Sequence, residues 1–214
     1  MRILVLWTKP SGYLISQLKA LHDLGVEVHL FAQSAEDDAP FEFQDECSFL
    51  SSYRDTSRIE SRLLLSMANK VSPDMILICS WNNLKYLSVA RKSKATRILF
   101  MDNQWRKTIK QISGVFLRSF IIAPHFDGVL LPGQRQERFA RYLGFKPNQI
   151  SKNGYSADIV KFLTVKTLPT SRAFLFVGRL VEEKGLDILI QAYERYRTAR
   201  KNPWSLNIVG NGVL

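Results

Sequence analysis

Two cations follow an apolar run near the C-terminus at a spacing that suits phosphate chemistry. Residues 173–177 form the apolar run, which predicts a buried strand, and Gly178 and Arg179 follow it directly. Lys184 stands just before a helix predicted over residues 186–200. Positive side chains and free backbone N–H groups at a strand-to-helix connection can hold a diphosphate. The alternative is an ordinary turn with solvated charges.

A second group of polar residues follows a predicted strand over residues 75–79. Trp81, Asn82 and Asn83 stand where open α/β sheets present side chains to a ligand, so they are candidates for contact with an acceptor. The alternative is a turn in which Asn82 or Asn83 caps the helix predicted over residues 84–92.

Strands and helices alternate along the chain, as in βαβ units. Besides the elements already named, strands are predicted over residues 3–7, 26–31, 97–101, 128–131, 149–152 and 205–209, and helices over residues 13–24, 57–70 and 134–143. This order predicts an α/β fold with a doubly wound, Rossmann-like parallel sheet. A segment without apolar periodicity, residues 164–172, predicts a linker between a domain of residues 1–163 and a further unit, residues 173–214.

Residues 174–212, together with residues 153–158 and Phe162, resemble the retaining glycosyltransferases of family 4, also called glycosyl transferases group 1. The resemblance implies a GT-B fold, in which residues 1–163 form the acceptor-side domain and residues 173–214 begin the donor-binding domain. It implies transfer of a sugar from a nucleotide-diphosphate sugar to an acceptor hydroxyl, in the synthesis of a glycan, polysaccharide or glycolipid. The acceptor would be a glycan or a lipid-linked molecule. No metal and no cofactor are expected.

The resemblance also assigns roles to particular residues. Arg179 and Lys184, with Gly178, would contact the diphosphate of the donor. The loop after the first strand has two adjacent glycines in the family, and here it offers Ser11, an acceptor-side candidate, and Gly12, a candidate for backbone contact with the diphosphate.

Two further positions depart from the family pattern. Where the family often has a histidine facing the donor sugar, Asp102 and Asn103 are the candidates for that catalytic role. The family's pair of glutamates, seven residues apart, has no counterpart in the chain. We therefore expect a C-terminally truncated sequence with little or no transferase activity of its own.

The segment of residues 105–122 mixes cations with aromatic and aliphatic residues. An interfacial helix on anionic lipid has this composition, and core packing is the alternative. The candidates for contact with a membrane surface are Trp105, Arg106, Lys107, Lys110 and Arg118.

The charge of the chain is unevenly distributed. Residues 1–60 carry 5 basic and 10 acidic side chains, whereas residues 61–214 carry 25 and 9, which suits an anionic partner. No apolar run reaches the ~20 residues of a membrane span, and the first apolar run is too short for a signal peptide. A cytoplasmic protein, peripheral on the inner face of the membrane, is therefore expected. The rival hypothesis is a non-catalytic basic module that binds anionic lipid or nucleic acid, although motifs for reading nucleic acid are absent and we expect no nucleic-acid partner.

Overall fold

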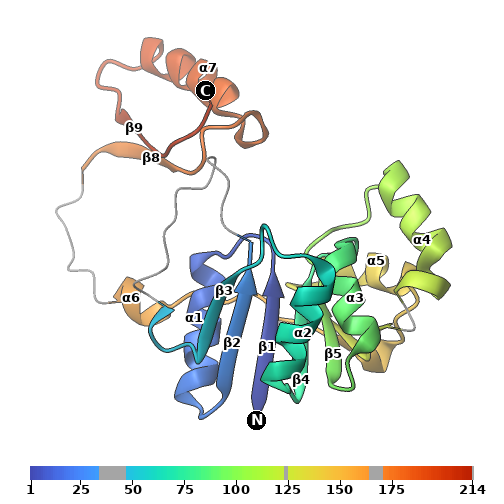
Figure 1. The fold of residues 1–214 in the computed structure, drawn as a ribbon. Coiled ribbons are helices and arrows are strands. Elements are labelled where there is room, and N and C mark those ends of the chain that lie inside the picture. The colour runs from blue at the N-terminus through green and yellow to red at the C-terminus, as the bar shows by residue number, and fades with distance from the viewer. Residues whose placement is uncertain (34–46, 123–124, 164–170, 214) are drawn as a thin grey trace. The chain divides into compact units, whose positions relative to one another are not determined.

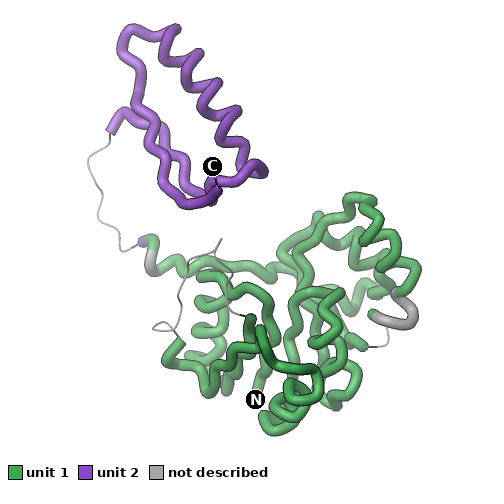
Figure 2. The backbone as a smooth tube through the Cα atoms, turned by 45° about the horizontal axis from the view of Figure 1, so that its top comes forward, with its two compact units in different colours: residues 1–162 green, residues 163–214 purple. Residues whose placement is uncertain are grey.

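The structure, a computed structural model, describes residues 1–33, 47–122, 125–163 and 171–213, without the side chains of residues 118–121 and 161. The chain divides into two compact units, Met1–Phe162 and Leu163–Leu214, which Figure 2 shows in green and purple. Of the predicted linker, residues 164–170 lie outside the described residues.

The first unit is built on a seven-stranded sheet. Its strands run in the order β3-β2-β1-β4-β5-β6-β7, and every neighbouring pair is parallel. Their bounds are β1 Arg2–Trp7, β2 Glu27–Ala32, β3 Ser52–Asp55, β4 Met75–Cys79, β5 Thr96–Phe100, β6 Gly128–Leu130 and β7 Ile150–Ser151. The chain moves outward from β1 to β3 and then returns to the other side of β1. This reversal is the doubly wound arrangement that the sequence predicts.

Helices connect the strands of this sheet (Figure 1). The connecting helices are α1 Gly12–Asp23, α2 Ser61–Val71, α3 Leu84–Lys92, α4 Ile109–Ile121 and α5 Glu137–Tyr142, with short 3-10 turns η3 Gln134–Gln136 and η4 Pro147–Gln149. Helix α6 Ile159–Leu163 follows the last strand of the sheet. Because parallel crossovers are right-handed, the reversal at β1 puts α1 on one face of the sheet and α2 on the other. The helices α2 and α3 pack side by side.

Buried side chains and hydrogen bonds anchor the centre of the sheet at its carboxyl edge. In β1, Leu4 and Leu6 have no exposed surface, which explains the continuous apolar run of this strand. The hydroxyl of the buried Tyr86 donates a hydrogen bond of 2.7 Å to the carbonyl of Trp7, and it lies 3.1 Å from the hydroxyl of Thr56. The last residue of β1 is therefore fixed by a helix that packs on the sheet.

The structure differs from the sequence-based prediction at one sheet edge. Strand β3 was not predicted, because its four residues include a single apolar side chain and lie at the edge of the sheet. The predicted helix over residues 57–70 begins instead at Ser61. Asp55 accepts hydrogen bonds from the backbone N–H (2.8 Å) and the hydroxyl (2.7 Å) of Ser57, which holds this segment as a turn.

The second unit is one βαβ unit, as predicted. Strand β8 (Ala173–Val177) leads through η5 (Glu182–Lys184) into helix α7 (Leu186–Thr198) and then into β9 (Ser205–Val209), which pairs in parallel with β8. The ring of Phe174 packs against Tyr196 and Trp204, with ring centres 5.2 and 5.5 Å apart.

Candidate functional site

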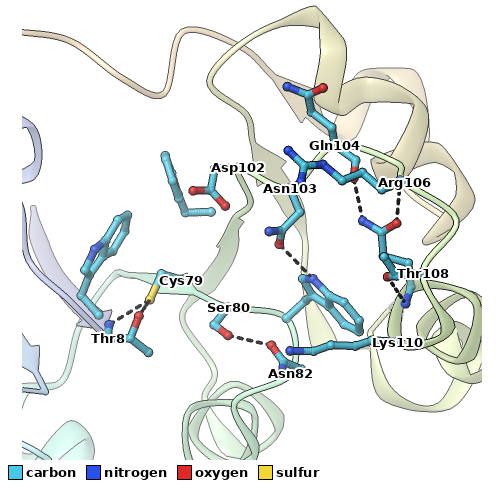
Figure 3. Close-up of a pocket in the computed structure, with 14 residues that line it drawn as sticks. Thr8, Cys79, Ser80, Asn82, Asp102, Asn103, Gln104, Arg106, Thr108 and Lys110 are labelled. Atoms are coloured by element: carbon cyan, nitrogen blue, oxygen red, sulfur yellow. Dashed lines mark hydrogen bonds between the residues drawn. The ribbon is translucent and has the colours of Figure 1, made fainter. Parts of the chain in front are cut away.

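A cavity of about 600 Å³ opens at the carboxyl edge of the first sheet. Its walls come from the ends of β1, β4 and β5 and from the start of α4 (Figure 3). The cavity therefore lies at the point where the strand order reverses, which is where doubly wound sheets bind their ligands. Its volume is within the range of small-molecule sites.

Trp81 forms a wall of this cavity and also belongs to the core. The residue is 7% exposed, and its ring meets Phe139 edge-on at 5.7 Å. A Cβ atom at Gly114 would lie 2.5 Å from the indole, so α4 packs on Trp81 only because position 114 has no side chain. The indole N–H donates a hydrogen bond of 3.2 Å to the side-chain oxygen of Asn103.

The loop between β5 and α4 is folded over the cavity by one buried glutamine. The side chain of Gln111 accepts a hydrogen bond from the backbone N–H of Arg106 (2.7 Å) and donates one to the carbonyl of Gln104 (2.6 Å). As a result, Arg106 and Lys110 both extend toward the strand ends that carry Asn103 and Asn82 (Figure 3).

Asp102, a predicted catalytic candidate, lines the cavity beside a tyrosine that the sequence did not single out. The hydroxyl of Tyr155 donates to the Asp102 carboxylate at 3.4 Å, and the ring of Tyr155 packs edge-on against Phe100 at 5.1 Å. Burial and the nearby carboxylate raise the pKa of Tyr155 to about 12, so Tyr155 is protonated at neutral pH and donates a hydrogen bond to Asp102. Tyr155 lies in the segment of residues 153–158 that resembles the family, which was the one available signal.

Cys79 lies in the wall of the cavity and is a thiol rather than a thiolate. Its sulfur accepts a hydrogen bond from the backbone N–H of Thr8 at 3.0 Å, and burial raises the pKa of the thiol to about 11 from an ordinary value near 9. A pKa that is higher in the folded than in the unfolded state stabilises the fold below pH 9, and this contribution is lost as the pH rises toward 11.

We therefore expect the free energy of unfolding to fall between pH 9 and pH 11 by on the order of 2 kcal/mol because of Cys79. The measurement is urea unfolding at a series of pH values. The Cys79→Ser variant keeps an acceptor for Thr8 and does not titrate in this range, so its unfolding free energy should fall less than that of the wild type. The fall that remains comes from other groups, among them Tyr86 and Tyr155, whose pKa values are raised to about 12. A variant curve parallel to that of the wild type would contradict the assignment.

The remaining acceptor-side candidates divide between the cavity and helix caps. Asn82 lines the cavity, whereas Asn83 caps α3 by accepting from the backbone N–H groups of Lys85 (3.1 Å) and Tyr86 (3.3 Å). Ser11 caps α1 by accepting from Leu14, and Gly12 is the first residue of α1.

The candidates for the membrane surface are also separated in space. Trp105 packs into the first unit, with ring centres 5.5 Å from Phe139 and 4.9 Å from Tyr142, as the core alternative expects. Lys107 is exposed. The side chain of Arg118 lies outside the described residues.

In the second unit, the three diphosphate candidates stand at the carboxyl end of β8. The N–H of Gly178 donates to the carbonyl of Val209 at 3.0 Å, and the exposed Arg179 follows it. Lys184 ends η5, and Gly185, with a φ of +62°, turns the chain into α7. Within the described part of the chain, neither Arg179 nor Lys184 has an ion-pair partner, and no group of three His, Cys, Asp or Glu residues could hold a metal.

Comparison of the sequence with protein families identifies a match to the family "Glycosyl transferases group 1" over residues 164–214. No curated protein matches the chain. The helices among the described residues include none that is both long and apolar enough to span a membrane.

Several solved structures resemble the fold. The protein of Listeria monocytogenes assigned as a UDP-N-acetylglucosamine 2-epimerase is 11% identical with a TM-score of 0.58, over 100% of this chain and 64% of its own. S. aureus MnaA, solved with UDP, is 14% identical with a TM-score of 0.61, over 99% of this chain and 62% of its own. A further UDP-N-acetylglucosamine 2-epimerase is 8% identical with a TM-score of 0.52, over 97% of this chain and 62% of its own. The chain thus spans less than two thirds of these proteins. It has a GT-B-type, Rossmann-like α/β fold, and residues 164–214 are similar to the family "Glycosyl transferases group 1".

Proposed function

We propose that the protein is a glycosyltransferase that moves a sugar from a nucleotide-diphosphate sugar to an acceptor hydroxyl with retention of configuration, as in family 4. The observation that carries this proposal is that two cations, Arg179 and Lys184, have no ion-pair partner among the described residues and lie in the segment that matches the glycosyltransferase family. Negative charge develops on the leaving diphosphate in the transition state. These cations and the N–H groups at the start of α7 would stabilise that charge without a metal ion.

The first unit would bind the acceptor, a glycan or a lipid-linked molecule, in the cavity at its carboxyl edge. Asp102 and Asn103 line this cavity and remain the candidates for the residue that faces the donor sugar. The UDP found with S. aureus MnaA, which has a similar fold, supports a nucleotide-sugar donor.

A nucleotide-sugar epimerase is the second candidate function, favoured by the similarity in fold to the epimerases. An epimerase would convert a nucleotide sugar in the absence of any acceptor, whereas a transferase would release the nucleoside diphosphate only as a glycoside forms. Analysis of the products formed from UDP-N-acetylglucosamine separates the two.

We also propose that α4 attaches the protein peripherally to an anionic membrane on the cytoplasmic side. Ile109, Ile112 and Phe116 follow the spacing of one helix face and are 87%, 40% and 80% exposed. The exposed Lys107 precedes this helix and Lys110 lies in its first turn, and the sequence has no acidic residue between Asp102 and Asp127. An exposed apolar helix face with cations beside it suits a bilayer surface.

The donor site is tested by calorimetric titration of the chain with UDP, GDP and ADP. We expect one of these to bind more tightly than its monophosphate, because the second phosphate meets Arg179 and Lys184. The Arg179→Gln variant should bind that diphosphate about tenfold more weakly, which corresponds to a loss of ~1.4 kcal/mol in binding free energy. Arg200→Gln, which removes an exposed cation beyond α7, is the matched control and should bind like the wild type. Equal affinities of Arg179→Gln and the wild type would refute the donor site.

A further inference from the structure

The cavity of the first unit is lined mainly by hydrogen-bond donors. The indole of Trp81 can only donate, so the side-chain oxygen of Asn103 must face it, and the two N–H bonds of the Asn103 amide are left over. The side-chain oxygen of Asn82 likewise accepts from the hydroxyl of Ser80 at 2.8 Å, which leaves the amide N–H bonds of Asn82. Among the described residues, none accepts from either of these two amide groups.

Two cations add to this donor set. Arg106 and Lys110 line the same cavity, and neither forms an ion pair within the described residues. Two acceptors of the lining are already engaged, since the carbonyl of Gln104 and the hydroxyl of Thr108 both accept from Gln111. One cavity of about 600 Å³ is thus lined by donors from three places: the end of β4, the end of β5, and α4 with the loop before it.

Asp102 is the one acidic residue among the residues that line the cavity, and it is not paired with Arg106 or Lys110. Its carboxylate accepts from Tyr155. A carboxylate can accept a hydrogen bond from a hydroxyl group, whereas it repels an anion. The cavity therefore offers two different subsites, an acceptor for a hydroxyl at Asp102 and a set of donors around Arg106 and Lys110.

We propose that this cavity binds a ligand that carries a phosphate group together with a hydroxyl group, with the phosphate held by Arg106, Lys110 and the amides of Asn82 and Asn103. The oxygen atoms of a phosphate ester accept hydrogen bonds from several directions. Such a group therefore suits a cavity in which the donors come from separate segments of the chain. The proposal rests on the proposed function in one respect, namely that this ligand is the acceptor of the sugar. The acceptor is then a phosphorylated molecule, either a soluble sugar phosphate or the headgroup of a phospholipid.

The test uses the full chain, labelled with ¹⁵N, and inorganic phosphate as the probe. The indole N–H of Trp81 lies at the cavity, and Trp204 lies in the second unit, so the two resonances report on the two units separately. We expect the Trp81 resonance to shift with phosphate and to saturate. Arg106→Gln and Lys110→Gln should each raise the apparent dissociation constant about tenfold. Lys110→Arg, which keeps the charge, should restore most of the affinity.

Lys94→Gln is the matched control, because Lys94 is exposed and precedes β5 at the opposite edge of the sheet. It should bind phosphate at Trp81 like the wild type. A Trp81 resonance that does not respond to phosphate, or one that responds equally in Arg106→Gln and the wild type, would overturn the proposal. The Arg179→Gln variant should leave the Trp81 titration unchanged, so failure of the donor site and failure of this site are read independently.

The source of the phosphate is decided in a second arm with glucose 6-phosphate and with phosphatidylcholine vesicles that contain phosphatidylglycerol. A soluble acceptor predicts that glucose 6-phosphate binds more tightly than inorganic phosphate, with the same loss in Arg106→Gln. A lipid headgroup predicts that vesicle binding depends on phosphatidylglycerol and falls about tenfold in both Arg106→Gln and Lys110→Gln. If Arg106→Gln and Lys110→Gln bind both glucose 6-phosphate and the vesicles as tightly as the wild type does, the cavity is not a phosphate site.

Discussion

The Gly210→Ala variant is expected to lose the fold of the second unit and with it the binding of a nucleoside diphosphate. A Cβ atom at position 210 would collide with the carbonyl oxygen of Gly178, at the end of the strand pair β8–β9. Backbone cannot move aside as a flexible side chain can, so the two strand ends must separate. We expect a loss in the free energy of unfolding of about 3 kcal/mol or more, at or above the upper end of ordinary overpacking. Because Arg179 directly follows Gly178, the diphosphate candidates would be displaced as well.

The matched control is Gly178→Ala. Gly178 follows β8 and Gly210 follows β9, so the two glycines are the two sides of the same close contact. There a Cβ atom would lie 3.6 Å from its nearest neighbour, the ring of Phe176, which is an ordinary contact. The free energy of unfolding is measured by urea titration, with the indole resonance of Trp204 reporting on this unit. Identical unfolding midpoints for Gly210→Ala and Gly178→Ala would contradict the steric argument.

The fold was predictable from the sequence where strands are buried on both faces. Leu4 of β1 and Ile78 of β4 have no exposed surface, and both strands are continuous apolar runs, so the hydrophobic pattern alone marks them. Edge strand β3 has no such requirement, because its Arg54 and Asp55 are exposed, and its sequence resembles a loop. The order of the buried strands then fixes the position of the cavity, since the reversal at β1 creates it.

The roles of neighbouring polar residues were not predictable in the same way. Asn82 and Asn83 are adjacent and chemically identical, yet one lines the cavity and the other caps α3. Arg106 and Lys110 were singled out for a membrane surface, whereas the structure adds a position in the cavity wall. That position depends on the buried side chain of Gln111, and a contact of this kind leaves no periodic signal in the sequence.

The same dependence on close packing makes Gly154 a second critical position. A Cβ atom there would lie 2.9 Å from the ring of Phe100, 3.0 Å from the carbonyl oxygen of Leu131 and 3.1 Å from the side chain of Leu130. The backbone of Gly154 also donates to the Leu131 carbonyl and accepts from the side chain of Gln17, each at 2.8 Å. Three close neighbours and two hydrogen bonds leave no direction in which a side chain could be accommodated.

Gly154→Val is therefore expected to destabilise the first unit by about 3 kcal/mol, at the upper end of overpacking costs, and to displace the adjacent Tyr155 from Asp102. Urea unfolding measures the first effect. The pKa of Tyr155, raised in the wild type to about 12, measures the second and should fall toward 10 as the ring becomes exposed. Gly133→Ala, where the nearest atom to a Cβ is 3.9 Å away, is the control and should change neither quantity. If Gly154→Val unfolds like this control, contacts other than the packing of Gly154 against β5 and β6 hold Tyr155 in place. The hydroxyl subsite at Asp102 then does not depend on the packing of Gly154.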